Sequence, residues 1–345
     1  MFFISDNGSG VAPEVMAALA AETGPALPYG ADPTTAALTL RLREIFEAPE
    51  AEVALVPTGT AANALAIATL TPPWGAVFCH ATAHIDADEC GAAEFFSGGA
   101  KLVPLPGEHG KLTPEALRAG LGRFMPGNQH AVIPAALSLT NVTELGTLYT
   151  PAEIAALTVE ARAQGLACHL DGARFANALA ATGATPAEMT WQAGIDLLSL
   201  GGTKNGLMGA EAVVLFDPAR AAEFRIRRKR GGHLMSKQRY LAAQLRAWLD
   251  GGLWLRLAAE ANARAARLAA ALAELPGVRL CHAVEANMIF AQLPRSLHAR
   301  ARAAGAQFYD MTETAEHVTV RLVCSWSTTD DEIAAFLAAL GAESP

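Results

Sequence analysis

The sequence lacks the features that would place it in several large classes of protein. No uninterrupted apolar run reaches the about 18 residues that would predict a membrane-spanning helix. With 26 Lys and Arg against 34 Asp and Glu, the net charge of -8 argues against nucleic acid as the main partner. The five cysteines are scattered without a C-x-x-C pair, and the beginning MFFISDNGSG has no basic segment typical of a signal peptide. We therefore expect reduced thiols and a cytoplasmic protein.

Through the first two thirds of the chain, strand-like apolar runs alternate with alanine-rich helical patterns. One helix is predicted with both its ends, from the N-cap Thr150 and Pro151 to Gly165. The alternation predicts an α/β fold, with a mostly parallel sheet between helices. The predicted strands lie within 52–59, 75–80, 100–105, 130–140, 166–174, 195–206 and 211–216.

The pattern changes after about residue 220. Long helical segments are followed by short strands that are separated by turns, at 278–283, 288–293 and 318–326, and by a last helix. We predict a smaller α+β domain there. The expected division is an N-terminal arm at 1–12, a large domain at 13–249 and a small C-terminal domain at 250–345.

Lys204 is the first candidate for chemistry, because it is the one basic residue in the apolar and glycine-rich stretch 196–216. Burying an ammonium group is costly. Desolvation lowers the pKa of a lysine and makes its amine a nucleophile towards carbonyl groups. The structural alternative is a lysine that extends from a strand end to solvent.

Two predicted strand ends carry further candidates. Thr58, Gly59 and Thr60 form a turn before a helix, where free N–H groups favour an anion such as a phosphate; the alternative is an ordinary turn with a threonine cap. The turn is neither a Walker A loop nor G-x-G-x-x-G. Asp171 follows an apolar strand and can keep a ring nitrogen protonated, or it can pair with Arg174 to cap a loop.

Histidines and arginines leave more alternatives open. His80 and His84 are four residues apart, which allows a zinc site, a ring stacked on a planar ligand, or a histidine satisfied within the core. The basic cluster 225–230 is a solvated face, or it meets a phosphate or a neighbouring subunit. Arg321 stands alone in an apolar strand and needs an anionic partner, either a substrate carboxylate or a structural acid.

Together these residues match the needs of a pyridoxal-phosphate enzyme: a phosphate turn, a stacking ring, an acid, an amine and a carboxylate-binding arginine. The chain resembles the low-specificity L-threonine aldolases, of the β-eliminating lyase group with fold type I. Matching stretches span nearly the whole chain: SDNGSG, PYGADPTT, PTGTAANALA, TAHIDADECGA, HGKLTPEAL, HLDGARFANA, GGTKNG, SKQRYLAAQ, GLWLRLAAEAN and VRLVCSW.

The resemblance implies a role for each matching residue. Lys204 is implied to bind pyridoxal 5′-phosphate covalently, Asp171 to contact its pyridine nitrogen, and His84 to stack on its ring. The phosphate is implied to lie on Thr58, Gly59 and Thr60. The remaining implied contacts are Arg174 with the cofactor oxygen or the substrate carboxylate, Ser5 and Arg321 with the substrate carboxylate, His130 near the substrate hydroxyl, and Tyr29 and Lys229 from a neighbouring subunit. No metal is implied.

The implied reaction is retro-aldol cleavage of L-threonine, L-allo-threonine and other β-hydroxy-α-amino acids to glycine and an aldehyde, in a homotetramer built from close dimers. His84 is the first choice for the base that takes the hydroxyl proton, and His130 the second. Thr140 stands where many relatives have a glutamate, and YGAD and GGTK also depart from the commoner pattern. The alternatives are a phenylserine-preferring aldolase, another β-eliminating or transaminating enzyme, a non-catalytic relative and a zinc hydrolase.

Overall fold

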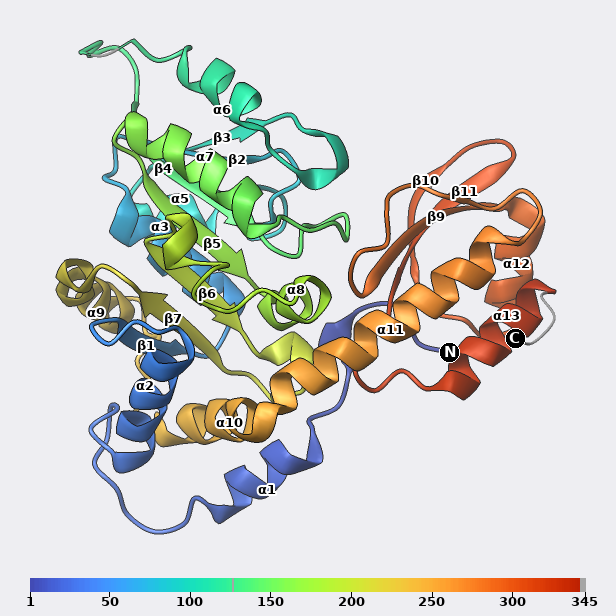
Figure 1. Cartoon of the computed structure of the whole chain (residues 1–345), viewed down its shortest axis with the longest axis horizontal. Coiled ribbons are helices and arrows are strands. Elements are labelled where there is room, and N and C mark those ends of the chain that lie inside the picture. The colour runs from blue at the N-terminus through green and yellow to red at the C-terminus, as the bar shows by residue number, and fades with distance from the viewer. Residues whose placement is uncertain (126, 342–345) are drawn as a thin grey trace.

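A seven-stranded sheet forms the centre of the larger part of the molecule in this computed structural model, which describes residues 1–125 and 127–341 (Figure 1). The strand order is β1-β7-β6-β5-β4-β2-β3. The five strands from β6 to β3 run parallel, whereas β7 is antiparallel to both β6 and β1. The mostly parallel sheet is thus confirmed. The bounds are Glu52–Val56, Gly75–His80, Lys101–Leu105, Ile133–Thr140, Ala167–Gly172, Leu197–Gly201 and Glu211–Leu215 for β1 to β7.

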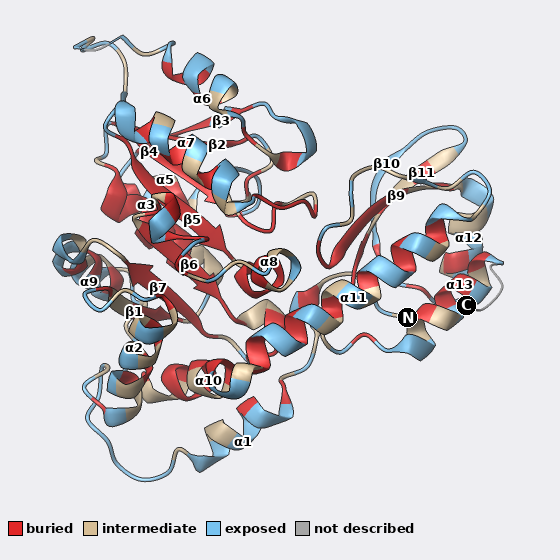
Figure 2. Cartoon of the chain, viewed as in Figure 1, coloured by how far each residue is buried: buried red, intermediate tan, exposed pale blue. Residues whose placement is uncertain are grey.

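Helices cover both faces of this sheet, because successive strand residues point to opposite sides. In β2, for example, Val77 packs into one core and Phe78 into the other. The helix α3 (Gly59–Leu70) lies on the Val77 side with α5 (Ala92–Ser97) and α9 (Ala221–Arg230), and every α3 residue from 61 to 70 is buried (Figure 2). The Phe78 side carries α2 (Pro33–Ile45), α6 (Pro114–Leu121), α7 (Pro151–Ala163), α8 (Phe175–Thr182) and α10 (Arg239–Leu249).

Two further helices belong to this part of the molecule. The helix α1 (Pro13–Ala21) packs against α10, and α4 (His84–Ala87) follows β2. The start of α7 is as predicted. Thr150 is its N-cap within a capping box, and Pro151 is its first residue.

A second, antiparallel sheet has the order β10-β11-β9-β8. Its strands are β8 (Arg279–Leu280), β9 (Met288–Pro294), β10 (Tyr309–Glu313) and β11 (His317–Val323), and its helices are α11 (Leu253–Ala273), α12 (Arg295–Ala303) and α13 (Asp330–Leu340). Phe3 is fully buried in this second core, so the beginning of the chain packs with its end.

The domain boundaries stay predictions. The helix α11 contacts both α8 and α13, so the two cores meet along one long helix rather than across a linker (Figure 1). The last four residues of the predicted small domain, 342–345, lie outside the described residues. The five cysteines are free thiols. Within the described residues, every helix is too short or too polar to span a membrane.

Candidate active site

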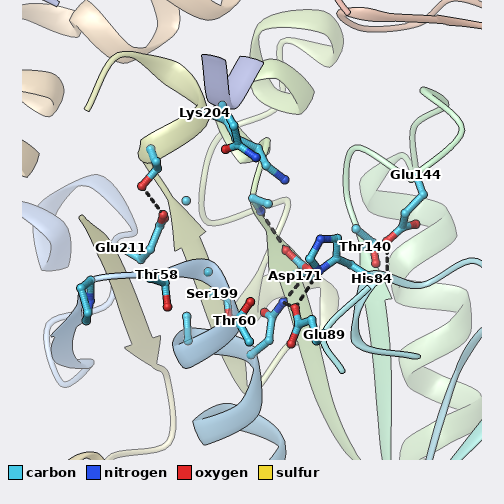
Figure 3. A pocket seen from close by; sticks show the side chains of 18 residues that line it. Thr58, Thr60, His84, Glu89, Thr140, Glu144, Asp171, Ser199, Lys204 and Glu211 are labelled. Carbon is cyan, nitrogen blue, oxygen red and sulfur yellow. Dashed lines mark hydrogen bonds and ion pairs between the residues drawn. The ribbon is translucent and has the colours of Figure 1, made fainter. Parts of the chain in front are cut away.

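A cavity of about 270 Å³ opens where β4, β5 and β6 end and α3 begins (Figure 3). This is the edge at which parallel α/β sheets bind ligands. The predicted residues Lys204, Asp171, His84, Thr58, Gly59 and Thr60 all line it, although they come from four separate elements or turns. Its other lining residues are Asn7, Pro57, Ala62, Asn63, Glu89, Thr140, Glu144, Ala173, Ser199, Gly201, Thr203 and Glu211.

Lys204 lies in a one-turn 3-10 helix, Thr203–Asn205, that directly follows β6. The buried carboxylate of Glu211 shapes this turn: it accepts hydrogen bonds from Gly202 N (2.8 Å) and from the Thr203 hydroxyl (2.5 Å). Among the described residues no carboxylate pairs with the Lys204 amine. Burial, followed by the positive charge of Arg174, lowers the pKa of Lys204. The structure therefore does not support the alternative in which Lys204 extends from a strand end to solvent.

Asp171 is buried at the end of β5, with 3% of its surface exposed. Its carboxylate accepts hydrogen bonds from Asn63 Nδ2 (2.8 Å) and from Ala173 N (2.9 Å). The same Asn63 amide also donates to Glu89 (2.9 Å), and Glu89 bonds to His84 Nδ1 (2.8 Å). Asp171 does not pair with Arg174, so the loop-capping alternative does not hold.

The turn before α3 leaves room for an anion. Thr58 caps the helix through the N–H of Ala61 (3.1 Å). The N–H groups of Gly59 and Thr60, at the first two helical positions, cannot reach a carbonyl group of their own helix. Gly59 has open space where a side chain would stand. A phosphate fits this chemistry, because the helix start also carries a partial positive charge.

Beside the cavity, Arg174 forms a bidentate ion pair with Asp6, at 2.6 Å from Nε and 2.8 Å from Nη2. Asn287 also donates to Asp6 (3.1 Å). Burial raises the pKa of Asp6, but the charge and hydrogen bonds of Arg174 outweigh it and hold the pKa below its ordinary value. We did not predict Asp6 from the sequence, since nothing within SDN indicates a partner 168 positions away.

Arg321 and Ser5 belong to the same cluster. Arg321 Nη2 donates to the Ile4 carbonyl oxygen (3.3 Å), and its buried Nε has no hydrogen-bond partner among the described residues. Burial and the charge of Arg174 lower its pKa. Ser5 accepts from Asn7 N (3.2 Å), and Asn7 lines the cavity. Arg174 is thus paired with the buried Asp6, whereas Arg321 forms no ion pair among the described residues, which leaves its positive charge available to a ligand carboxylate.

We expect Asp6→Ala to lower the free energy of unfolding by about 3–5 kcal/mol, because it leaves the buried Arg174 guanidinium unpaired. The folded-state pKa of Asp6 lies below its ordinary 3.8, so its stabilisation is present above that pH and is lost as the pH falls. Urea unfolding at pH 7 and at about pH 3 measures both effects. Glu14→Ala, which removes an exposed pair with Arg256, is the control and should change little. If Asp6→Ala lowered the free energy of unfolding by the same amount at both pH values, the lowered pKa assigned to Asp6 would be contradicted.

Six predicted residues do not line the cavity of their own chain: Ser5, Arg174 and Arg321 lie in the cluster beside it, and His130, Tyr29 and Lys229 lie elsewhere. His130 is exposed on the loop between α6 and β4, where its N–H bonds to Asn128 Oδ1 (3.0 Å). Tyr29, half exposed, and the exposed Lys229 lie together on another part of the surface, with the amine 4.9 Å from the ring centre. The sequence cannot indicate which copy of the chain a residue serves.

His80 is a core histidine rather than a metal ligand. Its ring nitrogens bond to the Thr82 hydroxyl (2.8 Å) and to the Gly107 carbonyl oxygen (3.0 Å). No group of three or more His, Cys, Asp or Glu residues gathers as a metal site in the described part of the chain. The zinc alternative therefore has no ligand set there. Two of the five basic residues of the α9 cluster pair with nearby acids, Arg225 with Glu52 and Arg227 with Glu223, and the buried Arg228 donates to the Leu55 carbonyl oxygen.

Comparison with known proteins decides the family. The model of the beta-eliminating lyase family matches residues 3–294. The chain belongs to this family. It is 44% identical to a low specificity L-threonine aldolase of Pseudomonas aeruginosa, over 94% of this chain and 93% of that protein. A low specificity L-threonine aldolase of Pseudomonas sp. (strain NCIMB 10558) is 42% identical over 96% and 94%.

A solved threonine aldolase of Leishmania major has the same fold as this lyase. The TM-score is 0.93 at 30% identity, with 99% of this chain and 98% of that chain covered. The fold is therefore the predicted fold type I, and pyridoxal 5′-phosphate is the cofactor of the lyase. The residues present fit this group, since the cavity wall combines an unpaired amine, a buried carboxylate and a helix start open to a phosphate.

Proposed function

We propose that the protein cleaves the Cα–Cβ bond of β-hydroxy-α-amino acids, with L-threonine and L-allo-threonine as substrates, and releases glycine and an aldehyde. The observation that supports this most is the Lys204 amine, which faces the same cavity as Asp171 and the start of α3 without an ion pair of its own. The threonine aldolase names of the relatives give the substrate class.

Four groups of the chain would hold the cofactor. Lys204 would bind it covalently, and the N–H groups of Gly59 and Thr60 with the Thr58 hydroxyl would bind its phosphate. Asp171 would keep its ring nitrogen protonated through a charge-assisted hydrogen bond, and His84 would lie on its ring. When bound, the cofactor supplies a sink for the electron pair of the broken carbon–carbon bond.

His84 is oriented for this position by Glu89. The bond from Nδ1 to Glu89 fixes the ring and raises the pKa of His84, with burial opposing it. Its other ring nitrogen, Nε2, is left for the cofactor or substrate. The ring therefore combines a flat surface with one free polar atom, which supports the role of a stacking group.

Arg174, Arg321 and Ser5 would bind the substrate carboxylate and so align the bond to be broken. Arg321→Gln removes one charged donor, worth about 1.5–3 kcal/mol. We expect KM for L-threonine to rise about 10–100-fold while the absorbance of the bound cofactor is retained. Arg279→Gln, an exposed arginine of the second sheet, is the control. An unchanged KM would show that Arg321 serves only to hold the N-terminal segment at Ile4.

We also propose a cytoplasmic homotetramer of close dimers, in which Tyr29 and Lys229 complete the cavity of a neighbouring subunit. Their exposed contact with each other, outside their own cavity, supports this. Mixing Tyr29→Ala with Lys204→Ala under subunit exchange should restore activity, because some mixed dimers contain one intact site. If the mixture of the two variants stays inactive although mixed dimers form, the proposal that neighbouring subunits share their active sites is refuted.

Product analysis tests the reaction itself. Purified, yellow holoenzyme is incubated with L-threonine, L-allo-threonine or phenylserine, and glycine and aldehyde are measured together. The expected result is one glycine per aldehyde with either threonine isomer. A keto acid in place of glycine would indicate elimination or transamination, and a reaction with phenylserine alone would make the protein a phenylserine aldolase.

A further inference from the structure

Glu144 lines the cavity but has no part in the roles assigned above. Its Oε1 accepts a hydrogen bond from His84 N (2.8 Å). Its Oε2 is buried and has no hydrogen-bond partner among the described residues. A buried carboxylate oxygen without a hydrogen-bond donor costs free energy. We therefore expect either a donor from a bound ligand or a proton on the carboxyl group itself to satisfy this oxygen.

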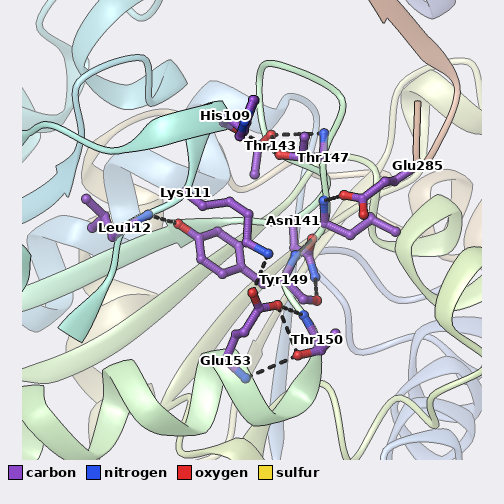
Figure 4. Close-up of polar contacts among 11 residues, drawn as sticks. His109, Lys111, Leu112, Asn141, Thr143, Thr147, Tyr149, Thr150, Glu153 and Glu285 are labelled. Atoms are coloured by element: carbon purple, nitrogen blue, oxygen red, sulfur yellow. Dashed lines mark hydrogen bonds and ion pairs between the residues drawn. The ribbon is translucent and has the colours of Figure 1, made fainter. Parts of the chain in front are cut away.

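The loop that carries Glu144, residues 141–150, is fixed by its own hydrogen bonds (Figure 4). Asn141 and Tyr149 bond to each other twice, at 2.9 and 3.1 Å. The hydroxyl groups of Thr143 and Thr147 are 2.8 Å apart. Glu285, from the segment before β9, accepts from Leu148 N (2.8 Å). Glu144 is therefore held in place by a rigid support, as an acid–base group requires.

The surroundings of Glu144 favour proton transfer near neutral pH. Burial raises the pKa of its carboxyl group to about 7; the charge of Asp171 adds to the rise, and the His84 N–H, the backbone N–H of Glu144 and the nearby Thr140 hydroxyl group oppose it. Tyr149 and Cys79 are the other titratable groups that the charge of Glu144 affects. A group with this pKa is ionised in part at pH 7 and still accepts a proton readily.

The two histidines considered for the base are less well placed. His84 has Nδ1 occupied by Glu89, and that bond raises its pKa, which favours the protonated form. His130 lies outside the cavity of its own chain. Thr140 lines the same cavity as Glu144, but its hydroxyl group does not ionise near neutral pH. The cavity wall therefore contains an acid even though residue 140 is a threonine.

We propose, on the basis of the function proposed above, that Glu144 is the catalytic base for the β-hydroxyl group of the substrate. Oε2 accepts the hydroxyl hydrogen bond and takes the proton as the Cα–Cβ bond breaks. The O–H electron pair becomes the second carbon–oxygen bond of the aldehyde, and the Cα–Cβ pair stays with the glycine fragment. Glu144 then passes its proton, through water or Lys204, to Cα, so one proton leaves the hydroxyl and one arrives at carbon.

Glu144→Gln tests this in the holoenzyme, since the amide oxygen still accepts from His84 N but takes no proton. Two reactions are compared: cleavage of L-threonine, and exchange of the Cα hydrogen of glycine for deuterium, which needs the cofactor but no hydroxyl group. We expect kcat for cleavage to fall about 10²–10³-fold. Glycine exchange should stay within about twofold of wild type. The wild-type rise of kcat through about pH 7 should be absent from the variant.

Cofactor-free protein gives an independent readout. Because the folded-state pKa of Glu144 is raised, wild type should lose stability as the pH rises through about 7. The Tm of Glu144→Gln should fall less between pH 6 and pH 8. Glu211, whose pKa burial also raises to about 7, contributes equally to both proteins. The same fall in Tm for both proteins would overturn the proposal.

Glu285→Gln is the matched control, because Glu285 accepts a backbone N–H of the same loop at the same 2.8 Å and does not line the cavity. Glu285→Gln should keep both L-threonine cleavage and glycine exchange, because the glutamine amide oxygen can still accept from Leu148 N. The proposal would be overturned if Glu144→Gln cleaved L-threonine at a rate within a few fold of wild type. It would also be overturned if glycine exchange were lost in parallel with cleavage, because Glu144 would then only support the turn that carries His84. A wild type that exchanges glycine but releases no aldehyde from L-threonine would instead refute the function proposed above.

Discussion

Lys204→Ala should abolish cleavage, with kcat reduced by at least about 10³-fold, and should prevent covalent attachment of the cofactor. The amine is the proposed nucleophile of the site, and no other lysine lines the cavity within the described residues. Borohydride reduction followed by peptide mass analysis of wild type should find the cofactor on Lys204. The same treatment of the variant should find it on no peptide.

The control for this prediction is Lys101→Ala, which removes an exposed lysine from β3. It should keep the yellow colour and full activity. Removing Lys204 should not unfold the chain, because its turn is shaped by Glu211 through Gly202 and Thr203 rather than by the amine. Cofactor fixed to another lysine of wild type would refute the assignment.

Asp171→Asn should lower kcat about 10²–10³-fold while the cofactor still binds. The asparagine oxygen can accept from Asn63 or from Ala173 but not from both, so one of the two hydrogen bonds is lost. Also lost is the negative charge that we propose keeps a proton on the ring nitrogen. We expect the absorbance of the bound cofactor to shift as well, because its protonation changes.

Asp196→Asn is a suitable comparison for Asp171→Asn. Asp196 lies at the opposite end of the same parallel strands, where it accepts from Cys168 N (2.7 Å) and pairs with Arg162. Asp196→Asn should lower the free energy of unfolding and leave the absorbance of the bound cofactor unchanged. Wild-type turnover by Asp171→Asn would mean that the cofactor needs no acid at its ring nitrogen.

The sequence predicted those parts of the fold that depend on local patterns. Buried parallel strands appear as continuous apolar runs, so the seven strands of the first sheet were found. Lys204 and Asp171 were found because a charge directly after such a run has few structural explanations. The helices α1, α2, α4, α8, α9 and α12 and the strand β10 were not predicted. No alternation of apolar and polar residues marks β10, because all five of its residues are exposed.

Contacts between distant segments could not be predicted. The pairing of Arg174 with Asp6 depends on how the chain beginning packs against the second sheet, which no local pattern records. Arg321 was predicted to need an anionic partner because it is a lone cation in an apolar strand. It forms no ion pair among the described residues, so its contact with a substrate carboxylate stays a prediction. Glu144 was missed because a glutamate in a polar loop has no distinguishing pattern, and only folding brings it to the cavity.

The contacts of the first residues also determine the order in which the site can form during synthesis. Phe3 bonds through its N–H to Gln307 (2.8 Å) and through its carbonyl oxygen to Val323 (2.9 Å), and Asn287 bonds to Asp6. These partners leave the ribosome last, whereas the segment that they hold leaves first. The seven-stranded sheet can therefore form while the proposed carboxylate site is still open, and a chain stopped before residue 287 has Lys204 but lacks Asn287 and Arg321.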